Sequence, residues 1–314
     1  MAYLTNDGRV EHPDEPTPDA AFVVRLLRDQ FPDLAGHYVR PSNASGSSNW
    51  VFRVGDAYAV RLPRSDSYTA DLLTEAEFLP RLAPYLDVPV PDVRFLAEPS
   101  VAFPRPWTVV TWVPGATPSA MAPPRQARMA VGLGRFMRRL HDVDTFGSAA
   151  GPERWGYRAG EPVTDEIDGW ADRAARLLED IFDPGQVQKA WRRLRDVPPA
   201  SAPPCWIHTD LSIENLLVSP DGDLVGVVDF GGLGIGDRSV DLLYAWSMFD
   251  PSARDVLRSE SDTDEATWLR ARAWAFVGPG LLTIADYRHS MPDRTARLTR
   301  MVEVIAEEVG VPLR

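Results

Sequence analysis

The sequence predicts a two-lobed α+β fold, in which a small strand-rich lobe precedes a larger helical lobe. Strand-like segments concentrate between residues 49 and 113, whereas apolar residues recur at helical spacing from residue 125 onward. A chain of 314 residues is long enough for two such lobes. We therefore expect an N-terminal lobe at 1–113, ending in a linker at 109–113, and a C-terminal lobe at 114–314.

The N-terminal lobe is expected to hold two helices and three strands behind a polar, proline-rich arm at 1–17. Gly55-Asp56 supplies a turn between the first two strands, which should pair as a hairpin. Pro32 ends the first helix, and Pro114-Gly115 ends the last strand. In order, the elements are a helix at Ala20–Gln30, strands at Asn49–Val54 and Ala57–Leu62, a helix at Ala70–Ala83 and a strand at Trp107–Val113.

The C-terminal lobe is expected to be helical except for one hairpin. In that hairpin, Leu216–Val218 and Leu224–Val228 form the strands and Asp221-Gly222 forms the turn. The predicted helices span Arg125–His141, Asp165–Phe182, Gln186–Asp196, Asp237–Phe249, Glu265–His289 and Arg294–Val309.

Composition excludes several kinds of partner. The net charge of −12, from 45 acidic and 33 basic residues, argues against binding to nucleic acid or to an anionic membrane. No run of eighteen apolar residues could span a bilayer, and the N-terminus lacks the regions of a secretory signal. The single cysteine, Cys205, fits a reducing interior and a buried packing role. We expect a cytoplasmic monomer.

Three oxygen-bearing side chains stand at a spacing that suits phosphoryl transfer: Asp210, Asn215 five residues later, and Asp229 at the end of the predicted hairpin. A carboxylate is needed to orient an attacking hydroxyl, and hard oxygen ligands are needed to hold Mg²⁺ against nucleotide phosphates. The hairpin would return Asp229 close to Asn215, so that both could bind one ion. Each residue alone is more typical of a turn or a cap. Their joint spacing, H-x-D-x-x-x-x-N, hairpin, D-F-G, is typical of a kinase.

The segment from His208 to Gly232 resembles the aminoglycoside phosphotransferase family, the antibiotic and small-molecule kinases that share the protein-kinase core fold. The family's H-G-D-L, N, D-F-G and G-D-x-x-x-D-L patterns are matched by His208-Thr209-Asp210-Leu211, Asn215, Asp229-Phe230-Gly231 and Gly236-Asp237 with Asp241-Leu242. The resemblance implies that Asp210 orients the acceptor hydroxyl, that Asn215 and Asp229 hold Mg²⁺, and that His208 braces the loop. Thr209 stands where the family usually has glycine, and we expect a modest backbone adjustment there.

The resemblance also places a nucleotide, ATP or GTP, against the N-terminal lobe. A loop before the first strand is rich in small residues, which would let backbone N–H groups approach phosphate oxygens, although such a cluster is more often only a turn. The backbone of a linker after the last strand would read the purine edge. The loop residues are Ser45, Gly46, Ser47 and Ser48, and the linker residues are Thr111, Trp112 and Val113.

Arg61 would supply the cation for the nucleotide phosphates, in the place where kinases normally carry lysine. Arginine stays charged and can clamp phosphate through two nitrogens, although a solvent-facing arginine on an edge strand is a credible alternative. Its carboxylate partner on the following helix would be Glu75, with Glu77 as the alternative. These two carboxylates face different sides of a helix, so only one can reach Arg61.

The acceptor is the least determined part of the site. Acceptor pockets in the family are built by helices of the larger lobe, here Asp165–Phe182 and Glu265–His289. Asp165, Asp168 and Asp172 share one face of the first helix and would attract a polycationic aminoglycoside, although a solvated acidic helix start is the commoner explanation. Large aromatic residues would instead favour a macrolide or another bulky apolar acceptor: Trp155, Tyr157, Trp170, Trp268, Trp274 and Tyr287. Family frequency favours the aminoglycoside.

Other functions fit the sequence less well. The G-x-G-x-G run at Gly232–Gly236 lacks the spacing of a dinucleotide-binding loop, and no P-loop motif occurs. The short segment from Gly231 to Asp237 leaves no room for the peptide-docking loop of a protein kinase. A nucleotide-binding pseudokinase is motivated by Arg61 and Thr209, but the three oxygen-bearing residues are intact.

Overall fold

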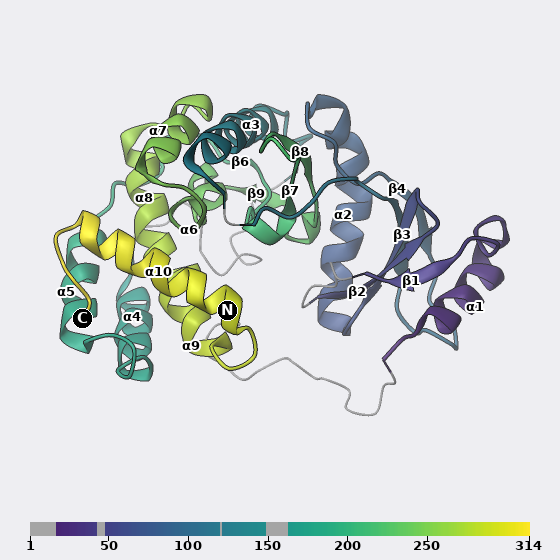
Figure 1. Ribbon diagram of the computed structural model, residues 1–314, viewed down its shortest axis with the longest axis horizontal. Helices are drawn as coiled ribbons and strands as arrows, with labels where there is room; N and C mark the ends of the chain where they lie inside the picture. The colour runs from purple at the N-terminus through teal and green to yellow at the C-terminus, as the bar shows by residue number, and fades with distance from the viewer. Residues whose placement is uncertain (1–16, 43–47, 120, 149–162) are drawn as a thin grey trace.

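The computed structural model describes residues 17–42, 48–119, 121–148 and 163–314. It confirms the predicted two-lobed α+β fold, with a sheet and two helices in one lobe and a bundle of helices in the other (Figure 1). The predicted arm at 1–17 lies outside the described residues except for Thr17. Within the described residues, no helix is long and apolar enough to cross a membrane.

A five-stranded antiparallel sheet with the order β1-β2-β3-β5-β4 organises the smaller lobe. The predicted hairpin is confirmed, because β2 pairs with β3 and Phe52 lies opposite Val60. Gly55 in its turn has a φ of 56°, a left-handed conformation that favours glycine. The strands are β1 (Val39–Pro41), β2 (Asn49–Val54), β3 (Tyr58–Pro63), β4 (Val93–Ala97) and β5 (Trp107–Thr111).

Two helices accompany this sheet and belong to different cores. Helix α1 (Ala20–Gln30) buries Val23 and Leu27 in the hydrophobic cluster of the smaller lobe. Helix α2 (Thr69–Leu82) instead buries Leu79 and Leu82 in the cluster of the larger lobe. Helix α2 therefore connects the two lobes, because it follows the β2–β3 hairpin in sequence and packs into the core of the larger lobe.

The larger lobe surrounds two small antiparallel sheets, one pairing β6 (Cys205–Ile207) with β9 (Gly234–Gly236) and the other pairing β7 (Leu216–Val218) with β8 (Leu224–Val227). The helices are α3 (Pro123–His141), α4 (Asp165–Leu177), α5 (Pro184–Leu194), α6 (Ala245–Met248), α7 (Pro251–Glu260), α8 (Glu265–Ala275), α9 (Thr283–Tyr287) and α10 (Pro292–Glu308). Helix α3 contacts β6 and β8, and Figure 1 shows it lying over them.

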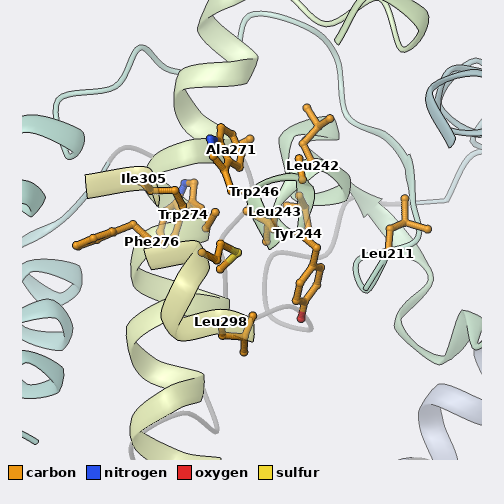
Figure 2. Packing of buried hydrophobic residues seen from close by; sticks show 14 of the residues in the cluster. Leu211, Leu242, Leu243, Tyr244, Trp246, Ala271, Trp274, Phe276, Leu298 and Ile305 are labelled. Atoms are coloured by element: carbon orange, nitrogen blue, oxygen red, sulfur yellow. The ribbon is translucent and has the colours of Figure 1, made fainter. Parts of the chain in front are cut away.

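The core of the larger lobe joins the C-terminal helices to the segment after β9. Figure 2 shows Leu243 and Trp246 packed among Trp274 of α8 and Leu298 and Ile305 of α10. This packing seats α10 against the segment that follows Asp241, which brings a C-terminal helix close to the loop after β6.

Two predicted helices were wrong in part, and a third, Asp165–Phe182, ends early at Leu177. The span Asp237–Phe249 is a 3₁₀ turn at Arg238–Leu242 followed by the short α6, because nearly every side chain there is buried and tertiary contacts override helical periodicity. The span Glu265–His289 divides into α8, a π-helical stretch at Phe276–Leu282, and α9. Pro279 lies inside that stretch and has no N–H for a regular helical bond.

Several elements were not predicted at all. Strands β1 and β4 are short and largely exposed, so they lack a hydrophobic pattern. Helix α7 did carry a signal, because the Asp250 side chain caps it and Pro251 opens it. The glycine run at 232–236 contains β9, which pairs with β6 rather than opening a helix.

Candidate active site

His208 fixes the start of the catalytic loop, which we define as residues 208–215. The imidazole is fully buried, and its Nε2 lies 3.1 Å from the carbonyl oxygen of Val228. Its Nδ1 accepts a hydrogen bond from the backbone N–H of Asp210 at 3.3 Å. Because both ring nitrogens are engaged by the backbone, the geometry suits a bracing side chain rather than a proton acceptor.

Asp241 holds the same loop through hydrogen bonds to its backbone, a role that sequence analysis did not predict. One carboxylate oxygen, Oδ1, accepts from the backbone N–H of Thr209 at 2.8 Å. The other, Oδ2, accepts from the N–H of His208 at 3.2 Å and lies 2.9 Å from Nε2 of His141. All these groups are buried. Asp241 belongs to the G-D-x-x-x-D-L motif, which was the available signal, whereas His141 lies 100 residues away in sequence and carried none.

Thr209 adopts a φ of 74°, in the left-handed region that β-branched residues avoid. This explains why glycine is the usual residue here in the family that the motif resembles. The Thr209 hydroxyl donates to the carbonyl oxygen of Gly232 at 3.0 Å. A Cβ atom at position 232 would overlap that hydroxyl, so the two positions are sterically coupled.

The two carboxylate oxygens of Asp210 differ in their contacts. The amide nitrogen Nδ2 of Asn215 donates to Oδ2 at 3.0 Å and to the Asp210 carbonyl at 2.9 Å. Oδ1 is buried and has no hydrogen-bond partner among the described residues. The guanidinium nitrogen Nη2 of Arg294, on α10, lies 3.8 Å from it. The side chain as a whole is 38% exposed, so an incoming hydroxyl can reach the carboxylate.

The β7–β8 hairpin brings Asn215 and Asp229 together, since the backbone N–H of Val228 donates to the carbonyl of Asn215 at 2.9 Å. Asn215 uses its amide nitrogen on Asp210, which leaves its amide oxygen as a ligand atom. Across the described residues, no cluster of three or more histidine, cysteine or acidic side chains could hold a metal. Two oxygen donors fit Mg²⁺, which binds through few protein ligands and completes its shell with phosphate oxygens and water.

Arg61 lies between two carboxylates. Its Nη1 lies 2.5 Å from Oε2 of Glu75 on α2, and its Nη2 lies 2.6 Å from Oδ1 of Asp229. Burial alone would lower the pKa of Arg61, but the charges of Glu75 and Asp229 outweigh that effect and raise the pKa. The side chain is thus a buried cation, and Glu75 rather than Glu77 is its partner on α2.

The structure describes only some of the other residues predicted to bind the nucleotide. Of the predicted phosphate loop, Ser45, Gly46 and Ser47 lie outside the described residues, and Ser48 directly precedes β2. In the predicted linker, the N–H groups of Thr111 and Trp112 donate to the carbonyls of Asp92 and Ala57, at 2.9 and 2.7 Å. Sheet formation therefore occupies both donors. The N–H of Val113 has no hydrogen-bond acceptor among the described residues, so it is the donor that could meet a purine.

Part of the acidic face expected on α4 forms contacts inside the larger lobe and does not face an acceptor. Asp168 accepts from Nε1 of Trp191 at 2.8 Å, and its two oxygens each lie 2.7 Å from nitrogens of Arg195. Asp168 therefore ties α4 to α5. Of the aromatic residues expected to favour a macrolide, Trp268 packs against Trp246 and Trp274 is buried in the core, while Trp155 and Tyr157 lie outside the described residues.

The comparisons with known proteins agree with this geometry. A family model described as the phosphotransferase enzyme family matches residues 41–274. An aminoglycoside 3′-phosphotransferase from Escherichia coli is 30% identical over 254 residues, which cover 77% of this chain and 86% of that protein. The solved GDP and kanamycin complex of APH(2″)-IIIa has a TM-score of 0.66 at 19% identity, covering 91% of this chain and 98% of that one. The macrolide 2′-phosphotransferase of Brachybacterium faecium, solved as the apoenzyme, has a TM-score of 0.58 at 18% identity, covering 88% and 97%. The chain therefore belongs to the phosphotransferase enzyme family.

Proposed function

We propose that this protein transfers the γ-phosphate of ATP or GTP to a hydroxyl group of a small molecule in a Mg²⁺-dependent reaction, and that the acceptor is an aminoglycoside. The observation that carries the chemistry is the convergence of Asp210, Asn215 and Asp229 in one site, with the buried Arg61–Glu75 ion pair beside them. These groups lie on two lobes and come from segments up to 168 residues apart.

Asp210 is proposed to orient the acceptor hydroxyl and to accept its proton. Asn215 fixes the carboxylate by binding Oδ2, and the backbone bonds of His208 and Asp241 fix the loop that carries it. Such positioning supplies most of the rate enhancement in phosphoryl transfer, because the chemistry itself needs little from the protein. Asn215 and Asp229 would hold Mg²⁺, which neutralises charge on the phosphates when it is bound.

Arg61 is proposed to meet the nucleotide phosphates from the other lobe. Glu75 holds one arm of its guanidinium fork, and the second arm lies against Asp229. The backbone of Ser45 to Ser48 would cover the phosphates, and the N–H of Val113 would meet the purine. Helix α2 positions the whole arrangement, because its C-terminal end is buried in the core of the larger lobe.

The proposed acceptor class rests on the relatives. Those that match at 26–30% identity are named aminoglycoside 3′-phosphotransferases. A macrolide is the second candidate, supported by the similar fold of macrolide 2′-phosphotransferases. A nucleotide-binding pseudokinase predicts no turnover at all. We also propose that the lobes divide at 113/114, after β5, and that the protein acts as a cytoplasmic monomer.

The test is a coupled assay of nucleotide turnover across aminoglycosides, macrolides and tuberactinomycin-type peptides, with ATP and with GTP. We expect Mg²⁺-dependent turnover with an aminoglycoside. Asp210→Ala should lower kcat by about 10² to 10⁴-fold and leave nucleotide affinity nearly unchanged. Asp221→Ala, at the exposed turn of the β7–β8 hairpin, is the control and should behave like the parent protein. Turnover with macrolides alone would overturn the acceptor class, and unchanged turnover in Asp210→Ala would overturn the mechanism.

A further inference from the structure

Helix α10 places two arginines on the catalytic loop. Arg294 and Arg297 are three residues apart, so they share one face of the helix. Arg297 forms an ion pair with Glu214, and Nη2 of Arg294 lies 3.8 Å from Oδ1 of Asp210. The charge of Arg297 is therefore balanced by a carboxylate that takes no part in the proposed chemistry. The guanidinium of Arg294 instead lies beside the carboxylate that is proposed to orient the acceptor.

The position of Arg294 is supported by Tyr244. Nη2 of Arg294 donates to the Tyr244 hydroxyl at 3.1 Å, and the guanidinium carbon lies 5.9 Å from the centre of the Tyr244 ring. Tyr244 is itself anchored, because its ring is buried at the border of the hydrophobic cluster that also holds Leu298 of α10 (Figure 2). The side chain of Arg294 is only 26% exposed. The guanidinium is thus held beside Asp210 rather than free in solvent.

An acceptor hydroxyl that binds the Asp210 carboxylate lies close to this guanidinium, because Nη2 of Arg294 is only 3.8 Å from one of the two carboxylate oxygens. Asn215 holds the other oxygen, which limits how the carboxylate can turn. The substituents on the neighbouring carbons of the acceptor then fall within a few ångströms of Arg294. At that distance a second cation is repelled, whereas a hydroxyl or ether oxygen can accept a hydrogen bond from the guanidinium.

We propose that Arg294 is a specificity-determining residue, which makes the enzyme prefer an acceptor hydroxyl flanked by oxygen over one flanked by an ammonium group. The proposal rests on the proposed function and deepens it, because it concerns which hydroxyl of a polycationic acceptor can be used. It also assigns α10 to the acceptor site, a role that the sequence did not suggest for this helix.

Kanamycin A and kanamycin B test this directly. They differ at one carbon of the amino sugar, next to the 3′-hydroxyl, where kanamycin A carries a hydroxyl and kanamycin B an ammonium group. We expect the parent enzyme to have the higher kcat/KM with kanamycin A. Arg294→Met should reduce the ratio of the two kcat/KM values by roughly fivefold or more, mainly through a lower KM for kanamycin B. Arg294→Lys should keep most of the preference, because it keeps the charge.

Arg300→Met is the matched control, since Arg300 is an exposed arginine on the same helix. It should leave the ratio unchanged. An unchanged ratio in Arg294→Met would overturn the proposal, whatever happens to kcat alone. If neither kanamycin is phosphorylated, the proposed acceptor class fails and the proposal for Arg294 fails with it. If both are phosphorylated and the ratio does not change, only the role of Arg294 is overturned.

Discussion

The two sides of the site are held by different kinds of contact. On the nucleotide side, which comprises Arg61, Glu75 and Asp229, a buried cation is paired with carboxylates from both lobes at 2.5–2.6 Å. On the acceptor side, which comprises Asp210, Arg294 and Tyr244, the arginine is partly exposed and lies 3.8 Å from its carboxylate. The nucleotide side is therefore built for a fixed geometry, whereas the longer, more solvated contact on the acceptor side can be displaced by a substrate.

The largest expected effect comes from breaking the nucleotide side at Arg61. Arg61→Ala leaves Glu75 buried without its cation, so the free energy of unfolding should fall by about 3–5 kcal/mol. Arg61→Lys should retain substantial activity and most of the stability. Urea unfolding and the KM for nucleotide measure the two effects. If Arg61→Ala behaves like the parent enzyme, the cation for the phosphates must come from elsewhere, with Arg64 and Arg53 next to be tested.

A second change tests whether the catalytic loop depends on Asp241. Asp241→Asn replaces a carboxylate oxygen that accepts buried hydrogen bonds with an amide nitrogen that cannot, at a cost of about 2–3 kcal/mol. We expect kcat to fall while the nucleotide Kd stays close to that of the parent. Thermal unfolding and nucleotide titration separate the two outcomes. Equal losses in kcat and in nucleotide affinity would show that Asp241 supports the whole lobe rather than this loop.

A smaller effect is expected at Thr209, where strain and a hydrogen bond oppose each other. Thr209→Gly removes the strain of a φ of 74° and also the hydroxyl bond to Gly232, two terms of about 1 kcal/mol each that should nearly cancel. Thr209→Ala keeps the left-handed backbone and loses the bond. The glycine variant should therefore have the higher Tm of the two. A lower Tm for glycine than for alanine would contradict the strain argument.

The smallest change concerns Cys205 and leaves both sides of the site intact. Burial raises the pKa of the Cys205 thiol to about 12, so the native protein should resist alkylation at pH 8 and react only after unfolding. The folded state keeps the proton that the unfolded state releases. The stabilising contribution is thus present below about pH 9 and lost as the pH rises toward 12. Cys205→Ser should remove this part of the pH dependence, as measured by unfolding between pH 8 and 11.

What could be predicted from the sequence depended on how far apart the contacting residues lie. The hairpin that joins Asn215 to Asp229 is local, and its turn residues predicted it. The ion pair of Arg61 spans only 14 residues, and Glu75 was the expected partner, with Glu77 as the alternative. His141 contacts Asp241, which holds the catalytic loop, across 100 residues, and Arg294 lies near Asp210 across 84 residues. Nothing in their local sequence indicates those contacts.

The secondary structure was also predicted better in some segments than in others, depending on how much of each segment meets solvent. Helices with one apolar face, such as α1 and α3, began and ended within about two residues of their predicted limits. The segments with almost no exposed side chain, Arg238–Leu242 and Phe276–Leu282, were predicted as regular α-helix and are instead 3₁₀ and π-helical. Periodicity is informative only where one face meets solvent, and these segments have no such face.

The contact between Thr209 and Gly232 also constrains the order in which this chain can change over generations. A Cβ atom at position 232 would overlap the Thr209 hydroxyl, so a side chain there is harmful as long as threonine remains. A smaller residue at position 209 would remove that overlap, and the carbonyl oxygen of His208, 3.0 Å from such a Cβ, would then be the closest atom. Conversely, a relative that carries glycine at the first position can gain this hydroxyl bond only if the second has stayed glycine. A change at position 209 is therefore a precondition for a side chain at position 232.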